Sequence, residues 1–201
     1  MKILVIGATG TIGASVARAL ESRHEVLRAS HSRSALTVDL ADPASTKRLY
    51  ARVGPVDAVV SAAGQAAFGP LLTLSDTDFA LSLSNKLMGQ VNLVRYGVEG
   101  LADGGSFTLT SGFLSRQPMP GGAAISMVNA GLEGFVRAAA LDLPRGIRIN
   151  AVAPGWVRET LVAMKRDPSA GVPAAQVAQT YVRSVEGSMT GQILDAVGGA
   201  G

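Results

Sequence analysis

Cysteine is absent from this chain of 201 residues, and aromatic residues make up only 4% of it. Without cysteine, the protein has no disulfides, no thiolate ligands for a metal and no cysteine nucleophile. The two histidines, His24 and His31, lie near one predicted strand and do not by themselves make a usual metal site. We therefore expect a protein without a bound metal.

Long hydrophobic runs are also missing. No apolar segment approaches the roughly 20 residues that a membrane-spanning helix needs, so no contact with a membrane is expected. The chain opens on an apolar strand segment instead of a signal peptide, which favours a cytoplasmic location. The net charge is only +3 and the basic residues are scattered, so nucleic acid is not an expected partner.

Hydrophobic residues, by contrast, make up 47% of the chain, and Ala, Val, Leu and Gly dominate. This composition suits buried parallel strands under closely packed helices. The length fits one domain over residues 1–201. Predicted strands and helices alternate, which indicates right-handed βαβ units. We therefore expect an α/β fold with a doubly wound, seven-stranded parallel sheet flanked by helices.

The predicted strands are residues 2–6, 25–29, 36–38, 56–60, 105–110, 147–152 and 192–197, and the predicted helices are 14–20, 43–53, 75–83, 85–101, 123–143 and 173–186. Pro43 falls in the first turn of a helix, where its missing N–H costs nothing. Ser75 is a predicted helix cap, with Asp78 three residues on. Irregular segments fall at 64–70, 117–122 and 156–172. Loops at the carboxyl ends of parallel strands build the ligand site of an open sheet.

The N-terminal segment MKILVIGATGTIG is predicted to form a strand, a glycine turn and the start of a helix, and its turn residues are Gly7, Thr9, Gly10, Thr11, Ile12 and Gly13. The spacing is G-x-x-G-x-x-G, not the commoner G-x-G-x-x-G. Glycines let backbone N–H groups approach a pyrophosphate, and the positive end of the helix faces the same anion. The segment therefore predicts a dinucleotide site; the alternative is an ordinary strand-to-helix turn.

The residues after the second predicted strand bear on the choice of cofactor. An acidic side chain there would accept a hydrogen bond from the ribose 2′-hydroxyl of NAD and repel the 2′-phosphate of NADP. The sequence instead has Ser30, His31, Ser32 and Arg33, whose hydroxyl and cationic groups suit a phosphate. We therefore expect NADP(H) to be preferred, with NAD(H) as the alternative; the other interpretation is a solvated basic turn.

Several motifs, taken in order along nearly the whole chain, resemble the short-chain dehydrogenase/reductase family. They are the glycine turn, Asp39-Leu40, Ser61-Ala-Ala-Gly64, Thr110-Ser111, Ile149-Asn-Ala-Val-Ala-Pro-Gly155, Thr190-Gly-Gln192 and Gly198-Gly199. The resemblance implies a Rossmann fold, a nicotinamide cofactor and oxidoreduction of a small carbonyl or alcohol substrate. It also implies a homodimer or homotetramer, paired through the helices at 85–101 and 123–143.

The resemblance also assigns cofactor contacts. Asp39, followed by Leu40, corresponds to the acid that meets the adenine amino group. The other matched contacts are the small residues that face the ribose and the turn beside the nicotinamide: Ser61, Ala62, Ala63 and Gly64 for the first, and Pro154, Gly155 and Val157 for the second.

The resemblance ends at the catalytic residues. The family uses a Ser that orients the substrate, a Tyr that transfers the proton, and a Lys four residues later that lowers the Tyr pKa. Ser111 matches the Ser, but Ile125 and Asn129 stand at the Tyr and Lys positions. Ile125 has no proton to transfer, which puts the usual mechanism out of reach. The pattern resembles an atypical subgroup that lacks the usual active-site residues.

A fourth family residue, an Asn on the preceding helix, corresponds to Lys86, with Asn85 beside it. Lys and Asn then have exchanged places, so that Lys86 is a candidate proton donor and Asn129 a candidate ligand of the nicotinamide ribose. The alternative is drift after catalysis was lost. Tyr181 is either a substitute proton donor or a packing residue, and Trp156 either lines the substrate pocket or packs within its loop.

The sequence thus predicts an NADP(H)-binding, oxidoreductase-like protein with an unidentified small-molecule substrate. If the protein is an enzyme, Ser111 binds a carbonyl oxygen and the proton comes from Lys86 or from water. One rival interpretation is a non-catalytic dinucleotide-binding protein, either a redox sensor or a partner-binding subunit. Another is a structural subunit of an oligomer with an empty site. The glycine turn favours binding, and Ile125 disfavours catalysis.

Overall fold

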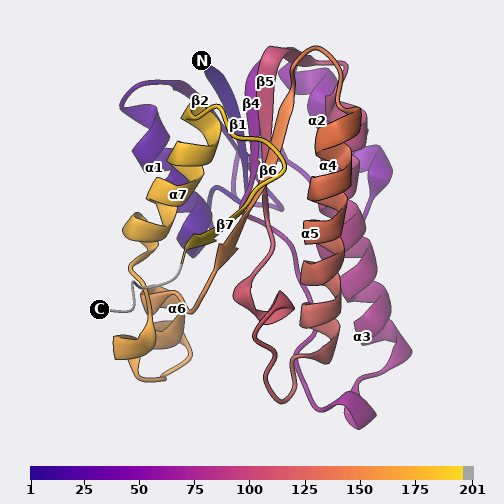
Figure 1. Ribbon diagram of the computed structural model, residues 1–201, viewed down its shortest axis with the longest axis vertical. Helices are drawn as coiled ribbons and strands as arrows, with labels where there is room; N and C mark the ends of the chain where they lie inside the picture. Colours follow the sequence, from indigo (N-terminus) through magenta and orange to yellow (C-terminus); the bar gives the residue numbers. More distant parts are fainter. Residues whose placement is uncertain (197–201) are drawn as a thin grey trace.

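A parallel sheet of seven strands forms the centre of the computed structural model, which describes residues 1–196 (Figure 1). The strands are β1 (Lys2–Ile6), β2 (Glu25–Ser30), β3 (Leu36–Thr37), β4 (Val56–Ser61), β5 (Leu101–Thr110), β6 (Arg148–Pro154) and β7 (Ile193–Ala196). They lie in the order β3-β2-β1-β4-β5-β6-β7, and every neighbouring pair is parallel. The predicted doubly wound, seven-stranded α/β sheet is confirmed.

Helices cover both faces of this sheet. One face carries α1 (Thr11–Glu21) and α7 (Ala174–Glu186), and the other carries α2 (Pro43–Val53), α4 (Gly89–Gly97) and α5 (Ala123–Asp142) (Figure 1). The remaining helical pieces are α3 (Asp76–Leu81), the π-helical segment η2 (Ser82–Met88), α6 (Arg158–Ala163), and the 3-10 turns η1 (Leu71–Thr73), η3 (Phe113–Ser115) and η4 (Pro168–Ala170). Among residues 1–196, none of these helices has both the length and the apolar character that crossing a bilayer requires.

The chain changes its direction of travel across the sheet between β1 and β4. After β1 it moves outward to β2 and β3, and it then returns to the other side of β1 and continues from β4 to β7. Ile6, at the end of β1, pairs with Ala29 of β2 and with Ser61 of β4. Loops that leave such a point diverge to opposite faces, and the crevice between them is where open α/β sheets bind ligands.

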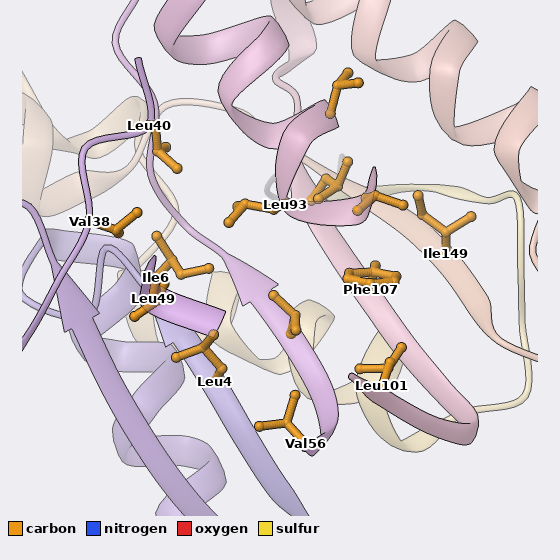
Figure 2. Close-up of a cluster of buried hydrophobic side chains, with 14 of the residues drawn as sticks. Leu4, Ile6, Val38, Leu40, Leu49, Val56, Leu93, Leu101, Phe107 and Ile149 are labelled. Atoms are coloured by element: carbon orange, nitrogen blue, oxygen red, sulfur yellow. The ribbon is translucent and has the colours of Figure 1, made fainter. Parts of the chain in front are cut away.

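Two apolar layers hold the helices against the sheet. On the face covered by α2, α4 and α5, side chains such as Leu4, Leu93 and Phe107 are fully buried and pack together (Figure 2). On the opposite face, Leu20 of α1 and Val177 of α7 belong to a second buried cluster. Full burial of one such side chain contributes about 1.5–3 kcal/mol. The strands that build the crevice are therefore held rigidly from both faces.

Both predicted helix starts are confirmed. Pro43 lies in the first turn of α2, and the Asp42 side chain caps the helix by accepting a hydrogen bond from the Ala44 amide at 2.8 Å. Ser75 caps α3 and forms a capping box with Asp78. Each cap satisfies backbone N–H groups that the first helical turn leaves without partners.

The structure differs from the predicted elements most clearly at two segments. The helix predicted at 85–101 is part of η2 followed by α4, and β5 already begins at Leu101. Leu101 is buried and pairs with Val56 of β4, so sheet pairing overrides the helical pattern there. The segment 156–172, expected to be irregular, contains α6. The last residue of the strand predicted at 192–197 and the Gly198-Gly199 motif lie outside the described residues.

Candidate functional site

Two cavities open at the carboxyl edge of the sheet. The first has a volume of about 550 Å³ and is lined by residues that follow β1, β2, β3 and β4. The second has a volume of about 420 Å³ and is lined by residues that follow β5 and β6. Both reach the start of α1, where Gly10 lines the first cavity and Ile12 lines the second. The two cavities therefore flank the same turn at the start of α1.

Two glycines of the turn between β1 and α1 leave no room for a side chain. Gly7 has φ +81°, and a Cβ there would lie 2.5 Å from the carbonyl oxygen of Ala62. A Cβ on Gly13 would lie 2.1 Å from the carbonyl oxygen of Gly7. α1 begins at Thr11, and Gly10 before it offers no side-chain cap. The first-turn N–H groups of α1 are therefore available to an anion.

The first cavity gathers most of the predicted cofactor residues. The Ser30 hydroxyl accepts a hydrogen bond from the Arg33 amide at 2.8 Å, which shapes the turn after β2. The Arg33 guanidinium donates to the Thr9 carbonyl oxygen at 3.4 Å, so its charge lies beside the glycine turn. The predicted residues that line this cavity are Gly7, Thr9, Gly10, Ser30, His31, Arg33, Asp39, Leu40, Ala62, Ala63 and Gly64.

Two polar residues of the first cavity were not assigned from the sequence. The Asn85 side-chain oxygen accepts a hydrogen bond from the Gln65 amide at 2.7 Å, and both residues line the cavity. This contact ties the loop after β4 to η2. The sequence offered no signal for Gln65, and Asn85 was distinguished only as the neighbour of Lys86.

The second cavity has mostly apolar walls. Phe113 and Trp156 pack edge to face, with ring centroids 6.2 Å apart. The exposed Arg166 guanidinium lies 5.7 Å from the centre of the Trp156 ring. The lining residues are Ile12, Phe68, Ser111, Gly112, Phe113, Leu114, Ile125, Asn129, Pro154, Gly155, Trp156, Val157, Thr160, Met164 and Arg166. Trp156 thus lines a cavity, the first of its two proposed roles.

Asn129 presents an unpaired acceptor at the second cavity. Its side chain is 1% exposed, and its Oδ1 has no hydrogen-bond partner among the described residues. Its Nδ2 donates to the Gly112 carbonyl oxygen at 3.5 Å, and a Cβ on Gly112 would lie 2.8 Å from that nitrogen. A buried polar atom left unpaired costs about 1–3 kcal/mol. A ligand hydroxyl at this point would remove that cost.

The Ser111 hydroxyl is engaged by a buried carboxylate. It donates to Glu133 Oε1 at 3.3 Å, and the Ser115 hydroxyl donates to the same oxygen at 2.6 Å. Glu133 is 3% exposed, and its other oxygen lies 3.8 Å from the Arg116 guanidinium and 3.5 Å from that of Arg137. The cluster fixes η3 against α5. Nothing in the sequence signals this contact, because Glu133 looks like an ordinary residue of an exposed helix face.

Lys86 is buried in η2, with 8% exposure. Its Nζ donates to the carbonyl oxygens of Thr110 at 3.2 Å and Ser111 at 3.4 Å. Burial lowers the pKa of Lys86 from 10.5 to about 8. The ammonium group therefore contacts backbone carbonyl groups at the end of β5, and it does not contact the Ser111 hydroxyl.

Some predicted site residues line neither cavity: Thr11, Gly13, Ser32, Ser61 and Lys86. Gly13 and Ser61 are buried beneath the glycine turn and the end of β4, whereas Thr11 and Ser32 are exposed. Tyr181 is fully buried, and its hydroxyl shares a hydrogen bond of 2.7 Å with Thr110 Oγ1. Burial raises the pKa of Tyr181. These contacts favour the packing role for Tyr181.

Comparison with known proteins adds independent information. A family model described as enoyl-(acyl carrier protein) reductase matches residues 7–193 of this chain. Oxidoreductase UcpA of Escherichia coli K12 is 27% identical over 181 residues, which cover 77% of this chain and 68% of that protein. The matched region includes the glycine turn and the strand ends that line both cavities.

Two solved structures are similar over nearly their full length. The protein lin1944 from Listeria innocua is 42% identical, with a TM-score of 0.94 over 98% of this chain and 99% of that one. A small-chain dehydrogenase in complex with NADPH is 30% identical, with a TM-score of 0.88 over 100% of this chain and 98% of that one. The shared fold thus extends to both cavities.

Proposed function

The chain belongs to the short-chain dehydrogenase/reductase family, and we propose that it binds NADP(H) across the two cavities at the carboxyl edge of its sheet. The observation that carries this proposal is the glycine turn, where Gly7 and Gly13 leave no room for a Cβ. Such a turn brings backbone N–H groups and a helix N-terminus to a pyrophosphate. The NADPH complex of a protein 30% identical to this chain supports the same cofactor class here.

The preference for NADP(H) over NAD(H) rests on the turn after β2. Ser30, His31 and Arg33 line the first cavity there, and none of them is a carboxylate that would repel a 2′-phosphate. A guanidinium and hydroxyl groups form charge-assisted hydrogen bonds to phosphate oxygens. Asp39, the carboxylate in this cavity, follows β3 and not β2, and we assign it to the adenine amino group.

Asn129 is the proposed ligand of the nicotinamide ribose. Its unpaired Oδ1 accepts a hydrogen bond from a ribose hydroxyl, and it does so without an ammonium group that would need a buried partner. Pro154, Gly155 and Val157 line the same cavity and are the proposed contacts of the nicotinamide ring and its carboxamide.

The proposed reaction is the interconversion of a carbonyl and an alcohol in the second cavity. NADPH held in these cavities would supply the hydride for the carbonyl carbon, and the carbonyl oxygen would take up one proton to give the alcohol. Ser111 lines the cavity and is the proposed partner of that oxygen. Ile125 has no proton to give, so the proton comes from water or, relayed through water, from Lys86, whose ammonium group does not line the cavity. A lysine pKa of about 8 suits proton donation near neutral pH.

A second candidate function is non-catalytic dinucleotide binding, in a redox sensor or a partner-binding subunit. Ile125 and Asn129 line the second cavity, and neither side chain transfers a proton. The hydrogen bond from Ser111 to Glu133 favours the same function, because the hydroxyl already has a partner. Both observations fit an atypical subgroup of the family that keeps the cofactor site.

We further propose a homodimer or homotetramer that pairs through α4 and α5. One side of α5 carries a strip of exposed small and apolar residues: Met127, Ala130, Gly131, Gly134, Ala138 and Leu141. A Cβ on Gly134 would meet no atom within 4 Å, so the space beside this helix is open. Small residues allow two helices to approach closely, and a contiguous exposed apolar strip marks an interaction surface.

Calorimetric titration of the native protein with NADPH, NADP⁺, NADH and NAD⁺, followed by a carbonyl screen at fixed NADPH, tests these proposals. Gly10→Val is the matched loss-of-binding variant. A Cβ on Gly10 meets only the Gly7 carbonyl oxygen at 3.4 Å, so we expect the variant to fold and its side chain to obstruct the proposed anion site. Binding with turnover supports the oxidoreductase, and binding without turnover supports the second candidate. Failure of all four nucleotides to bind refutes both.

A further inference from the structure

Arg166 has an unusual place in the second cavity. Of the described residues that line this cavity, only Arg166 carries a charge. Within residues 1–196 its guanidinium forms no ion pair, although its backbone amide donates to the Leu161 carbonyl oxygen at 2.9 Å. The fold therefore presents an uncompensated positive charge to an apolar cavity.

The indole ring of Trp156 holds this charge at the cavity. The Arg166 guanidinium lies 5.7 Å from the ring centroid, within the range of a cation–π interaction. Trp156 is itself fixed by edge-to-face packing against Phe113. The guanidinium is thus positioned by the wall of the cavity, and its hydrogen-bond donors stay free for a ligand.

The other residues that line the second cavity favour a ligand with an apolar surface. Phe68, Phe113 and Trp156 contribute aromatic faces, and Ile125 contributes an aliphatic one where a Tyr would bring a hydroxyl. Phe68 is 51% exposed and Met164 is 49% exposed, so two large apolar side chains of the cavity remain partly in water. Exposed apolar surface of this kind marks a binding site, because a ligand that covers it is stabilised by the hydrophobic effect.

We infer that the second cavity takes an apolar molecule that carries an anionic group, and that Arg166 recognises the anion. The volume of the second cavity, about 420 Å³, lies in the range of small-molecule sites. A cavity of this size holds an aromatic ring or a short alkyl chain. The inference rests on the proposed function, since this cavity is also the proposed nicotinamide and substrate site. It narrows the substrate to a carbonyl compound, or the matching alcohol, that bears a carboxylate or a similar anion.

The chain has one tryptophan, Trp156, which makes a direct binding assay possible. The probes are 3-benzoylpropionate, an aromatic keto acid, and its neutral amide, 3-benzoylpropionamide. Each is titrated into the native protein, with and without saturating NADP⁺, while Trp156 fluorescence is followed. The oxidised cofactor is used because it carries no hydride, so the probe is not reduced during the titration. We expect the carboxylate to bind about fivefold tighter than the amide at low salt, and the difference to shrink as salt is added.

Two variants separate the role of Arg166 from a general effect of charge. Arg166→Met removes the guanidinium at an exposed position and is expected to bind both probes equally. Arg158→Met is the matched control, because Arg158 is an exposed arginine of α6 that does not line the cavity. It should keep the native preference. Circular dichroism of both variants checks that the fold is retained.

The outcomes distinguish this inference from the proposed function. Equal binding of the two probes by native protein, no binding of either, or an unchanged preference in Arg166→Met each overturns the inference. In all three cases NADP(H) titration still reports on the proposed function. Failure to bind NADP(H), with the carboxylate preference present in the cofactor-free titration, refutes the proposed function and leaves the anion site standing.

Discussion

The side-chain nitrogen of Lys86 donates a hydrogen bond to the carbonyl oxygen of Thr110, 3.2 Å away, at the end of β5. The same oxygen accepts a second hydrogen bond, from Gln90 Nε2 at 2.9 Å. Two helical side chains thus donate hydrogen bonds to the last carbonyl group of β5, directly before Ser111. The lysine lies next to the candidate substrate site, and burial has already lowered its pKa.

The stability of the protein should depend on pH through Lys86. Burial lowers its pKa from 10.5 to about 8, so between these values the unfolded chain binds more protons than the folded one. Native stability therefore rises across this window. Lys86→Met has no such group, so its stability relative to the native protein should be greatest at pH 7 and fall by up to about 3 kcal/mol by pH 10.5.

Urea unfolding of both proteins at pH 7, 9 and 10.5 measures this difference. Lys165→Met serves as the control, since it removes a lysine from an exposed position. A difference between Lys86→Met and native protein that stays constant from pH 7 to pH 10.5 contradicts the prediction. It would mean that Lys86 keeps an ordinary pKa in the folded protein.

Activity should also depend on Lys86, if any is present. We predict that the native protein binds NADPH but reduces ordinary aldehydes and ketones at rates near background, and that Lys86→Met abolishes whatever activity is found. The measurement is NADPH oxidation at 340 nm with a panel of carbonyl compounds. Robust native turnover that survives Lys86→Met would show that the proton has another source.

Restoring the usual pair of residues should create activity. Ile125→Tyr combined with Asn129→Lys places a phenol at the second cavity and an ammonium four residues later, which together supply the missing general acid. We expect NADPH-dependent carbonyl reduction at least about tenfold above the native rate. Ile125→Phe combined with Asn129→Lys is the matched control without the hydroxyl. Equal rates in the two double variants would sink the proposal that the missing Tyr limits catalysis.

Cofactor choice should respond to a single charge. Native protein is expected to bind NADPH at least several-fold tighter than NADH, because Arg33 lies in the first cavity and the turn after β2 has no carboxylate. Arg33→Asp should narrow or invert that ratio in calorimetric titration. Arg158→Asp, at the first residue of α6, is the control for a change of net charge. Equal affinity of the native protein for both cofactors would refute the assignment.

Assembly should respond to the size of residue 134. We expect light scattering at micromolar concentration to show a homodimer or homotetramer. Gly134→Arg should yield monomers, because a Cβ there meets no atom of the same chain within 4 Å and the longer side chain projects from the exposed strip of α5. Gly134→Ala, which adds one methyl group, should remain assembled. A native monomer rules out the proposed pairing.

The glycine turn was predictable because its chemistry is local. Gly7, Gly10 and Gly13 lie between the end of a strand and the first turn of a helix, and close packing is observed at Gly7 and Gly13. The seven parallel strands of the sheet followed in the same way from alternating local patterns. By contrast, the start of β5 at Leu101 depends on its pairing with Val56, and no local pattern carries that information.

The contacts that were missed all join distant parts of the chain. Glu133 accepts a hydrogen bond from the Ser111 hydroxyl, which lies 22 residues earlier in the chain. Asn85 accepts one from the backbone amide of Gln65, which lies 20 residues earlier. The sequence also does not show in which direction a side chain points. The spacing marked Lys86 as a site residue, but only the fold shows that its ammonium group contacts backbone behind β5.

In the π-helical segment η2, residues Ser82–Met88, the number of residues decides which side chain faces the end of β5. A π-helix closes each hydrogen bond over five residues and not four, so the path through η2 holds extra chain relative to an α-helix. A deletion of one residue would let the segment tighten to α-helical geometry, so that the flanking helices keep their places while residues within the segment shift in register. A homologue with such a gap would present a neighbour of Lys86 to Thr110. An alignment gap here is then equivalent to a substitution in the site.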